Sequence, residues 1–174
     1  MNRSRLESLI REVADFPRPG IQFKDITPVL QDPEGFQFLV AEMSDQLKSF
    51  GKIEKLVAVE SRGFILASAL AVRNHLSLAL VRKPGKLPWK HITESYELEY
   101  GQGELSMHVD AVRENEKLVI VDDLLATGGT LEASAKLCEK LGGEVIGLQV
   151  FIELSALGGR ERLGAYSLSS LFKI

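Results

Sequence analysis

Hydrophobic positions in the first fifty residues recur at helical spacing. Residues 6–13 carry apolar side chains at i, i+3, i+4 and i+7, which predicts a first helix. Residues 16–20 contain two prolines and a glycine and end that helix. Asp32 followed by a proline is typical of a capped helix start, so a second helix is predicted over residues 33–50.

Beyond residue 50 the pattern changes to short, continuous apolar runs. Runs of this kind are typical of strands that are buried on both faces of a sheet. They cover residues 56–59, 78–81, 118–121 and 145–152. Helical patterns follow the first and third runs, over residues 63–75 and 131–141. This alternation predicts an α/β fold with a mostly parallel central sheet flanked by helices.

Residues 83–95 interrupt the alternation. They hold two prolines and a glycine and have no hydrophobic period, which predicts a long mobile loop. Residues 96–100 then alternate between apolar and acidic side chains, residues 101–103 contain two glycines, and residues 105–109 alternate again. This order predicts an antiparallel hairpin appended to the parallel sheet.

Composition narrows the class of protein. With 174 residues, 45% hydrophobic and 26% charged, the chain suits one globular domain. Its net charge of −3 gives no reason to expect nucleic acid or an anionic membrane as a partner. One cysteine, Cys138, and three histidines argue against a disulfide or a structural zinc site. We see no signal-peptide pattern and no apolar run of ~20 residues, so we expect a soluble cytoplasmic protein.

The strongest chemical signal follows the third apolar run. Asp122 and Asp123 end that predicted strand, and a turn with two glycines and two threonines over residues 126–130 leads into a helix. Ligands bind at the carboxyl ends of parallel strands, and glycine N–H groups at a helix start suit a phosphate. The two carboxylates suit a polyol or a hydrated metal. The alternative is that they are helix-capping acids beside a tight turn. Neither the P-loop nor the dinucleotide motif is present.

This string resembles the phosphoribosyl-diphosphate signature of the type I phosphoribosyltransferases, in the form found in their adenine-using members. Further matches to the family occur in the same order along the chain, at residues 16–20, 23–26, 60–64, 82–88 and 96–101. The resemblance implies the type I phosphoribosyltransferase fold as one domain over residues 1–174. Its N-terminal hood would cover about residues 1–35 and its core about residues 36–174, with a mobile antiparallel hairpin loop.

The resemblance also implies roles for individual residues. Asp122 and Asp123 would hold the ribose diol. The 5′-phosphate would be held by Ala126, Thr127, Gly128, Gly129 and Thr130. The diphosphate would be held by Glu60, Ser61, Arg62, Arg82, Lys83 and Lys86, with a cis bond between Glu60 and Ser61. The adenine would be bound by Phe23 and Lys24, and Glu99 would be the catalytic group that handles the purine proton.

Several of these residues also have an ordinary structural explanation. Arg62 could be an ordinary helix-start arginine, and the cations of residues 82–86 a solvated face. Phe23, taken alone, suits a hydrophobic core better than a ligand contact. Glu97 and Glu99 could be solvated charges on an edge strand. Hypoxanthine- and guanine-using relatives usually carry an acid where this chain has Ala126, so the resemblance selects Glu99 for the purine.

The implied reaction is purine salvage, in which adenine and 5-phosphoribosyl 1-diphosphate give AMP and diphosphate. Mg²⁺ is expected to arrive with the substrate diphosphate, with no residue assigned as a direct ligand. A homodimer is the family expectation, with small-molecule substrates as the other partners. One rival is a phosphoribosyltransferase for hypoxanthine, xanthine or orotate, against which Ala126 and Glu99 argue. The other is a regulator that senses the same sugar diphosphate and binds nucleic acid, against which the acidic charge balance argues.

Overall fold

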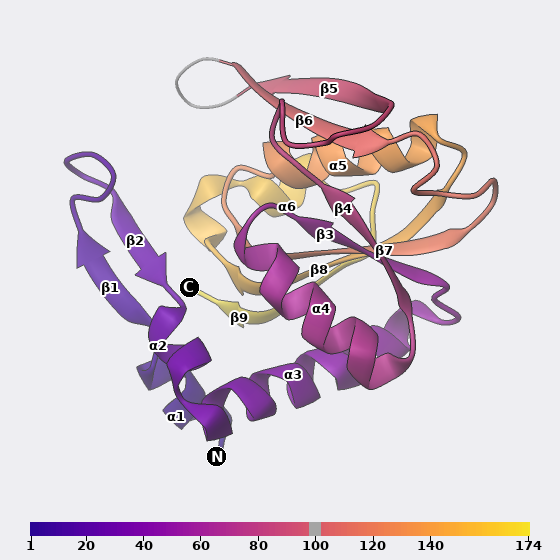
Figure 1. Cartoon of the computed structure of the whole chain (residues 1–174). Helices are drawn as coiled ribbons and strands as arrows, with labels where there is room; N and C mark the ends of the chain where they lie inside the picture. Colours follow the sequence, from indigo (N-terminus) through magenta and orange to yellow (C-terminus); the bar gives the residue numbers. More distant parts are fainter. Residues whose placement is uncertain (98–101) are drawn as a thin grey trace. The chain divides into compact units, whose positions relative to one another are not determined.

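A five-stranded parallel sheet organises the larger part of the chain in the computed structural model (Figure 1). The structure describes residues 1–97 and 102–174, which form two compact units, Met1–Met43 and Ser44–Ile174. In the second unit the strand order is β4-β3-β7-β8-β9, and every neighbouring pair is parallel. The predicted α/β class with a parallel central sheet is therefore confirmed. The predicted hood and core boundaries stay predictions.

The second unit contains helical segments on either side of a run of four consecutive strands, β4 to β7. In chain order, its elements are η1 (Lys48–Phe50), β3 (Lys55–Val59), α4 (Arg62–Asn74), β4 (Ser77–Val81), β5 (His91–Glu97), β6 (Gln102–His108), β7 (Lys117–Leu125), α5 (Gly129–Lys140), β8 (Glu144–Glu153), η2 (Ser155–Leu157), α6 (Gly159–Arg162) and β9 (Leu168–Lys173).

The sheet is covered on both faces, which explains the continuous apolar runs of its central strands. In β3 the side chains from Leu56 to Val59 are all buried. Helices α4 and α5 lie on opposite faces of the sheet (Figure 1). Alternate residues of a strand point to opposite faces, so a strand between two helical layers has no polar position.

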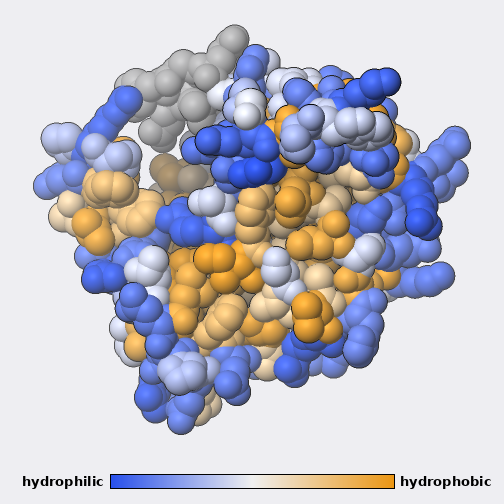
Figure 2. Space-filling view, viewed as in Figure 1, coloured by the Kyte–Doolittle hydropathy of each residue, from blue (hydrophilic) through white to orange (hydrophobic). Residues whose placement is uncertain are grey.

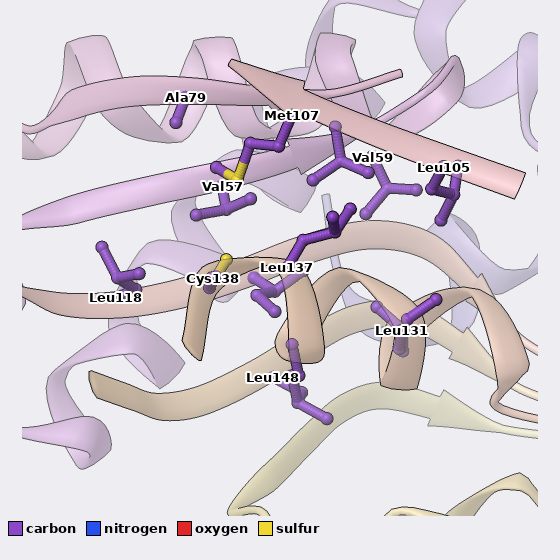
Figure 3. Close-up of a cluster of buried hydrophobic side chains, with 14 of the residues drawn as sticks. Val57, Val59, Ala79, Leu105, Met107, Leu118, Leu131, Leu137, Cys138 and Leu148 are labelled. Atoms are coloured by element: carbon purple, nitrogen blue, oxygen red, sulfur yellow. The ribbon is translucent and has the colours of Figure 1, made fainter. Parts of the chain in front are cut away.

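The core on the α5 side joins the sheet, α5 and the hairpin β5–β6. Val57 and Val59 of β3 meet Leu131 and Cys138 of α5, and Leu105 of β6 belongs to the same cluster (Figure 3). Burial raises the pKa of the Cys138 thiol to about 12. The cysteine therefore acts as a small apolar side chain in this cluster.

The hairpin is present, but its strands differ from the predicted ones. Strand β5 begins at His91 and pairs with β6 from His91–His108 to Glu97–Gln102. The prediction that residues 91–95 belong to a loop was wrong, as was the placing of residues 102 and 103 in the turn. The sequence of β5 is largely polar. It forms a strand because Ile92 and Tyr96 pack on the core cluster, an arrangement that only the tertiary structure supplies.

The hairpin is joined to the parallel sheet where β4 ends. Arg82 and Ser106 exchange two backbone hydrogen bonds, with N–O distances of 2.9 and 2.7 Å. Strand β7 also extends further than the predicted run, through Leu125, and Asp122 pairs with Val150 of β8. The two carboxylates were predicted to end this strand. They lie within its last residues, and Leu124 and Leu125 follow them in β7.

The first unit contains a short antiparallel pair that the sequence pattern did not predict. Its elements are α1 (Arg3–Ser8), β1 (Arg11–Ala14), β2 (Gln22–Asp25), α2 (Thr27–Gln31) and α3 (Pro33–Leu47), of which α3 continues into the second unit. The prediction of one helix over residues 6–13 was wrong, because Val13 lies in β1 and pairs with Phe23. The predicted second helix is confirmed. Asp32 Oδ1 accepts a hydrogen bond from Gly35 N–H at 2.7 Å, and η1 prolongs α3 to Phe50.

No helix within residues 1–97 and 102–174 combines the length and apolar character that crossing a bilayer requires.

Candidate active site

The carboxyl ends of β3 and β7 border a cavity of about 400 Å³. It lies within the second unit, at the edge of the sheet where ligands bind in parallel α/β folds. The lining residues are Glu60, Ser61, Arg62, Lys83, Tyr96, Leu105, Asp122, Asp123, Leu124, Leu125, Ala126, Thr127, Gly128, Gly129, Thr130 and Leu131.

Two buried carboxylates form one wall of this cavity. Asp122 and Asp123 are only 8% and 4% exposed. The backbone N–H of Asp123 donates to Asp122 Oδ1 at 2.8 Å, and Arg62 Nε lies 2.6 Å from Asp123 Oδ2. That buried Oδ2 receives no well-aligned hydrogen bond from any residue of the described ranges, although it has this ion pair. It therefore keeps the capacity to accept a hydrogen bond from a ligand.

Burial raises the pKa values of both carboxyl groups in this pair. For Asp122, loss of solvent and the charge of Asp123 raise the pKa well above its ordinary value. For Asp123, loss of solvent raises the pKa, while Arg62 acts in the opposite direction. Charged groups in such surroundings destabilise the fold unless something compensates them. A ligand that brings hydroxyl donors or a cation would supply that compensation, which makes the pair a candidate functional site.

The glycine–threonine loop, residues 126–130, connects β7 to α5. Gly128 has a φ of +85°, in the left-handed region that glycine adopts without strain, and α5 begins at Gly129. The loop thus brings the start of a 12-residue helix to the cavity wall. N–H groups at a helix start have no intrahelical partner, and the helix dipole favours an anion there. The loop can bind a phosphate.

Glu60 and Ser61 connect β3 to α4, and the peptide bond between them is cis, as the resemblance implied. The Glu60 carboxylate accepts a hydrogen bond from the Lys83 N–H at 2.9 Å and lies 3.3 Å from Arg82 Nε. Burial raises the pKa of Glu60, but these hydrogen bonds and the charge of Arg82 outweigh it, so that the pKa is lowered overall. Glu60 is therefore an ionised anchor for the first residues of the 82–90 segment.

The structure brings most of the residues assigned to the sugar, its phosphate and the diphosphate to one cavity, but not all of them. Within the described ranges, the lining includes Lys83 but neither Arg82 nor Lys86. Arg82 is engaged by Glu60, and its Nη1 donates to the Lys86 carbonyl at 3.0 Å. The described contact of Lys86 near the cavity is therefore made by its main-chain carbonyl, which accepts the hydrogen bond from Arg82.

The predicted adenine-binding residues belong to the first unit, and the predicted catalytic residue is not among the described residues. Phe23 and Lys24 belong to the first unit. The Phe23 ring meets the Phe16 ring edge-on at 5.1 Å between centroids, and buried Lys24 forms an ion pair with Glu12. Glu99 lies outside the described residues.

Five lining residues were missed from the sequence. Two of them come from the hairpin, Tyr96 of β5 and Leu105 of β6, and the others are Leu124, Leu125 and Leu131. The Tyr96 ring lies over Gly103, so close that a β-carbon there would stand 2.6 Å from the ring. This cross-strand pairing carried a weak signal, a glycine within an alternating run. The hairpin thereby adds to the apolar part of the lining, which also includes Leu124, Leu125 and Leu131.

Comparisons with known proteins agree with this geometry. A family model described as "Phosphoribosyl transferase domain" matches residues 29–172. The chain is 49% identical to an adenine phosphoribosyltransferase of Acetivibrio thermocellus, covering 95% of this chain and 97% of that protein. It is 51% identical to one of Ruminiclostridium cellulolyticum, covering 97% and 98%.

Solved structures give the same result. The crystal structure of the adenine phosphoribosyltransferase of Thermoanaerobacter pseudethanolicus has a TM-score of 0.96 and 47% identity, covering 98% of this chain and 99% of that one. The Saccharomyces cerevisiae enzyme, crystallised with adenine and an imino-altritol bisphosphate, has a TM-score of 0.93 and 32% identity, with 97% of each chain covered. The fold, the cavity and above all these similarities show that the chain belongs to the adenine phosphoribosyltransferase family.

Proposed function

We propose that this protein transfers the 5-phosphoribosyl group from 5-phosphoribosyl 1-diphosphate to adenine, giving AMP and diphosphate. The proposal rests on one observation: two buried carboxylates and the glycine–threonine loop line the same cavity at the end of β7. Relatives about half identical over nearly the whole chain are named adenine phosphoribosyltransferases, which supports adenine as the base.

In this proposal β7 and its loop hold the sugar. Asp122 and Asp123 accept hydrogen bonds from the 2′- and 3′-hydroxyls, since charge-assisted bonds of this kind are strong. The N–H groups of the glycine–threonine loop bind the 5′-phosphate. The C1′–O bond to diphosphate breaks and the C1′–N9 bond to adenine forms, while positive charge develops on the sugar. Catalysis is then mainly positioning and stabilisation of the leaving group's charge.

The diphosphate would meet the cations that line the cavity. Arg62 and Lys83 line it and can donate to diphosphate oxygens. A carboxylate would repel the same group, so we assign Glu60 the role of holding Arg82 and the Lys83 N–H in place. Lys86 is proposed to reach the diphosphate only if the 82–90 segment moves on ligand binding.

The adenine roles rest on the resemblance. Phe23 is proposed to stack on the base, with Lys24 beside it, and Glu99 to bond the purine as the N9 proton is lost. In the first unit Phe23 is half-buried, so part of its ring stays accessible. Ala126 leaves the cavity wall without the acid that relatives using other purines carry at this position.

Mg²⁺ is proposed as the metal that accompanies the diphosphate. The oxygen donors of Asp122, Asp123 and Thr130 on the cavity wall are the type that Mg²⁺ prefers, and the ion usually takes several ligands from substrate phosphates and water. When bound, Mg²⁺ would neutralise charge on the leaving diphosphate. Arg62 and Lys83 would orient the same group from the protein side.

A homodimer is proposed through the outward face of α4. Figure 2 shows hydrophobic side chains gathered over this helix. Val72 is 80% exposed and Ile65, two turns earlier, is 43% exposed. An apolar stripe of this kind suits a second copy of the chain. Light scattering should give twice the chain mass for the wild type and the single mass for Val72→Glu, and equal masses would contradict this interface. The cytoplasmic location stays a prediction.

The proposed reaction is tested with Mg²⁺, 5-phosphoribosyl 1-diphosphate and each base in turn. Chromatography should detect AMP with adenine, and one diphosphate for each AMP formed. Hypoxanthine, guanine, xanthine and orotate should give little or no nucleotide. Preferential use of one of these bases would overturn the assignment of adenine.

A further inference from the structure

The main chain of Gly159, the first residue of α6, packs directly against the main chain of the glycine–threonine loop. A β-carbon on Gly159 would approach the carbonyl oxygen of Ala126 well inside 3.0 Å, and Leu125 Cδ1 to 2.7 Å. From the other side, a β-carbon on Gly128 would stand 3.0 Å from the Gly159 carbonyl oxygen. There is thus no room for a side chain at this junction.

Helix α6 is fixed from behind, so it cannot readily yield to the loop. Arg160 makes a two-point contact with the buried Glu153 of β8, at 2.7 and 2.5 Å, and donates to the Leu168 carbonyl at 3.2 Å. Arg162 pairs with Glu132 of α5 at 2.7 Å. Two-point arginine–carboxylate contacts are geometrically strict. These bonds tie α6 to α5, which follows the loop, and to β8, which pairs with β7.

The geometry points to Gly159 as a positioning residue for the 5′-phosphate, an inference that rests on the function proposed above. The Ala126 carbonyl and the Thr127 N–H belong to one planar peptide unit, so displacing the carbonyl also turns the N–H. By having no side chain, Gly159 lets α6 set the position of that unit. The glycine itself is assigned no contact with the sugar or the base, and it acts through the loop.

Gly159→Ala tests this inference, with Gly164→Ala as the matched control. A β-carbon on Gly164 would meet only the Glu161 carbonyl of its own turn, at 3.2 Å. Calorimetric titration would use ribose 5-phosphate and magnesium diphosphate as separate probes. We expect Gly159→Ala to raise the Kd for ribose 5-phosphate roughly 10- to 100-fold, with the Kd for diphosphate unchanged. The control should bind both probes as the wild type does.

A purely structural role would weaken both probes equally in proportion to the loss of folded protein, and that result would overturn the inference. Wild-type affinity of Gly159→Ala for ribose 5-phosphate would also overturn it and leave the proposed function intact. If the wild type binds neither probe and forms no AMP, the proposed function itself fails. Should Gly159→Ala not fold, Arg160→Lys loosens α6 without adding atoms at the loop. About threefold weaker binding of ribose 5-phosphate alone would support the inference, and unchanged affinity would overturn it.

Discussion

Replacing Asp122 with asparagine should stabilise the free protein and weaken its binding of the sugar. The carboxylate is buried, and its pKa is raised well above 3.8 by loss of solvent and by the charge of Asp123. At neutral pH this group destabilises the fold, because the carboxyl ionises more readily in the unfolded chain than in the folded one. An amide of the same shape removes the charge, and its oxygen can still accept the Asp123 N–H bond.

The expected magnitudes follow from general values. Relief of about 1 kcal/mol would raise the Tm of a protein of this size by about 2–4 °C. In the variant, a charge-assisted hydrogen bond to a substrate hydroxyl becomes a neutral one, which reduces the binding free energy by about 1–2 kcal/mol. The Kd for 5-phosphoribosyl 1-diphosphate should therefore be roughly 5- to 30-fold higher. Asp123→Asn is the matched control, because it also breaks the ion pair with Arg62 and should not raise the Tm.

The pH dependence gives the sign of the effect. The pKa of Asp122 is raised above 3.8 in the folded protein. Its contribution to stability is therefore most favourable below pH 3.8, and this contribution is lost as the pH rises through the folded pKa. The Tm advantage of Asp122→Asn should therefore grow from acid to neutral pH. The assays are differential scanning calorimetry of the ligand-free protein and titration with magnesium and substrate. A lower Tm at neutral pH together with unchanged affinity would refute the reasoning.

Three further predictions follow from the site and its supports. Glu99→Gln should lower kcat roughly 100-fold or more with little change in the Kd of the sugar diphosphate, whereas Glu97→Gln should change neither, and equal activity of the two variants in steady-state kinetics would contradict the assignment. Trypsin should cut the free protein within residues 83–90, and the sugar diphosphate with Mg²⁺ should slow the cut, so equal rates in both states would count against a closing lid. The Arg160 hydrogen bonds lower the pKa of Glu153 from 4.5 to about 2, so this group contributes stability above pH 4.5 that is lost as the pH falls toward 2. Glu153→Gln should reduce the free energy of unfolding at pH 7 by about 3 kcal/mol and remove that pH dependence, as urea titrations at several pH values would show.

The parallel sheet, and the meeting of Asp122, Asp123 and the glycine–threonine loop at its edge, could be predicted from the sequence because their signals are local. A strand buried on both faces has to be apolar at every position, as in β3, and a tight anion-binding turn needs adjacent glycines, as at Gly128 and Gly129. Both requirements act on residues that are consecutive in the sequence, so a local pattern reveals them. The cis bond after Glu60 was implied by the resemblance alone, since no local pattern predicts one.

The hairpin strands were placed wrongly, and the N-terminal pair was not predicted, because these strands depend on distant partners. Strand β5 has a polar sequence and becomes a strand through β6 and the core cluster. Val13 fitted a helical stripe, but pairing with Phe23 across the chain overrides that local preference. The closeness of Gly159 to Ala126 is of the same kind, because α6 lies about thirty residues further along the chain.

A crystal structure of the protein with Mg²⁺ and 5-phosphoribosyl 1-diphosphate tests the central claim most directly. We expect the 5′-phosphate on the N–H groups of residues 127–130, and the ribose hydroxyls on Asp122 and Asp123. The diphosphate should lie toward Arg62 and Lys83. Density for the sugar diphosphate at any other place, with the cavity at the end of β7 holding only water, would contradict the proposed site.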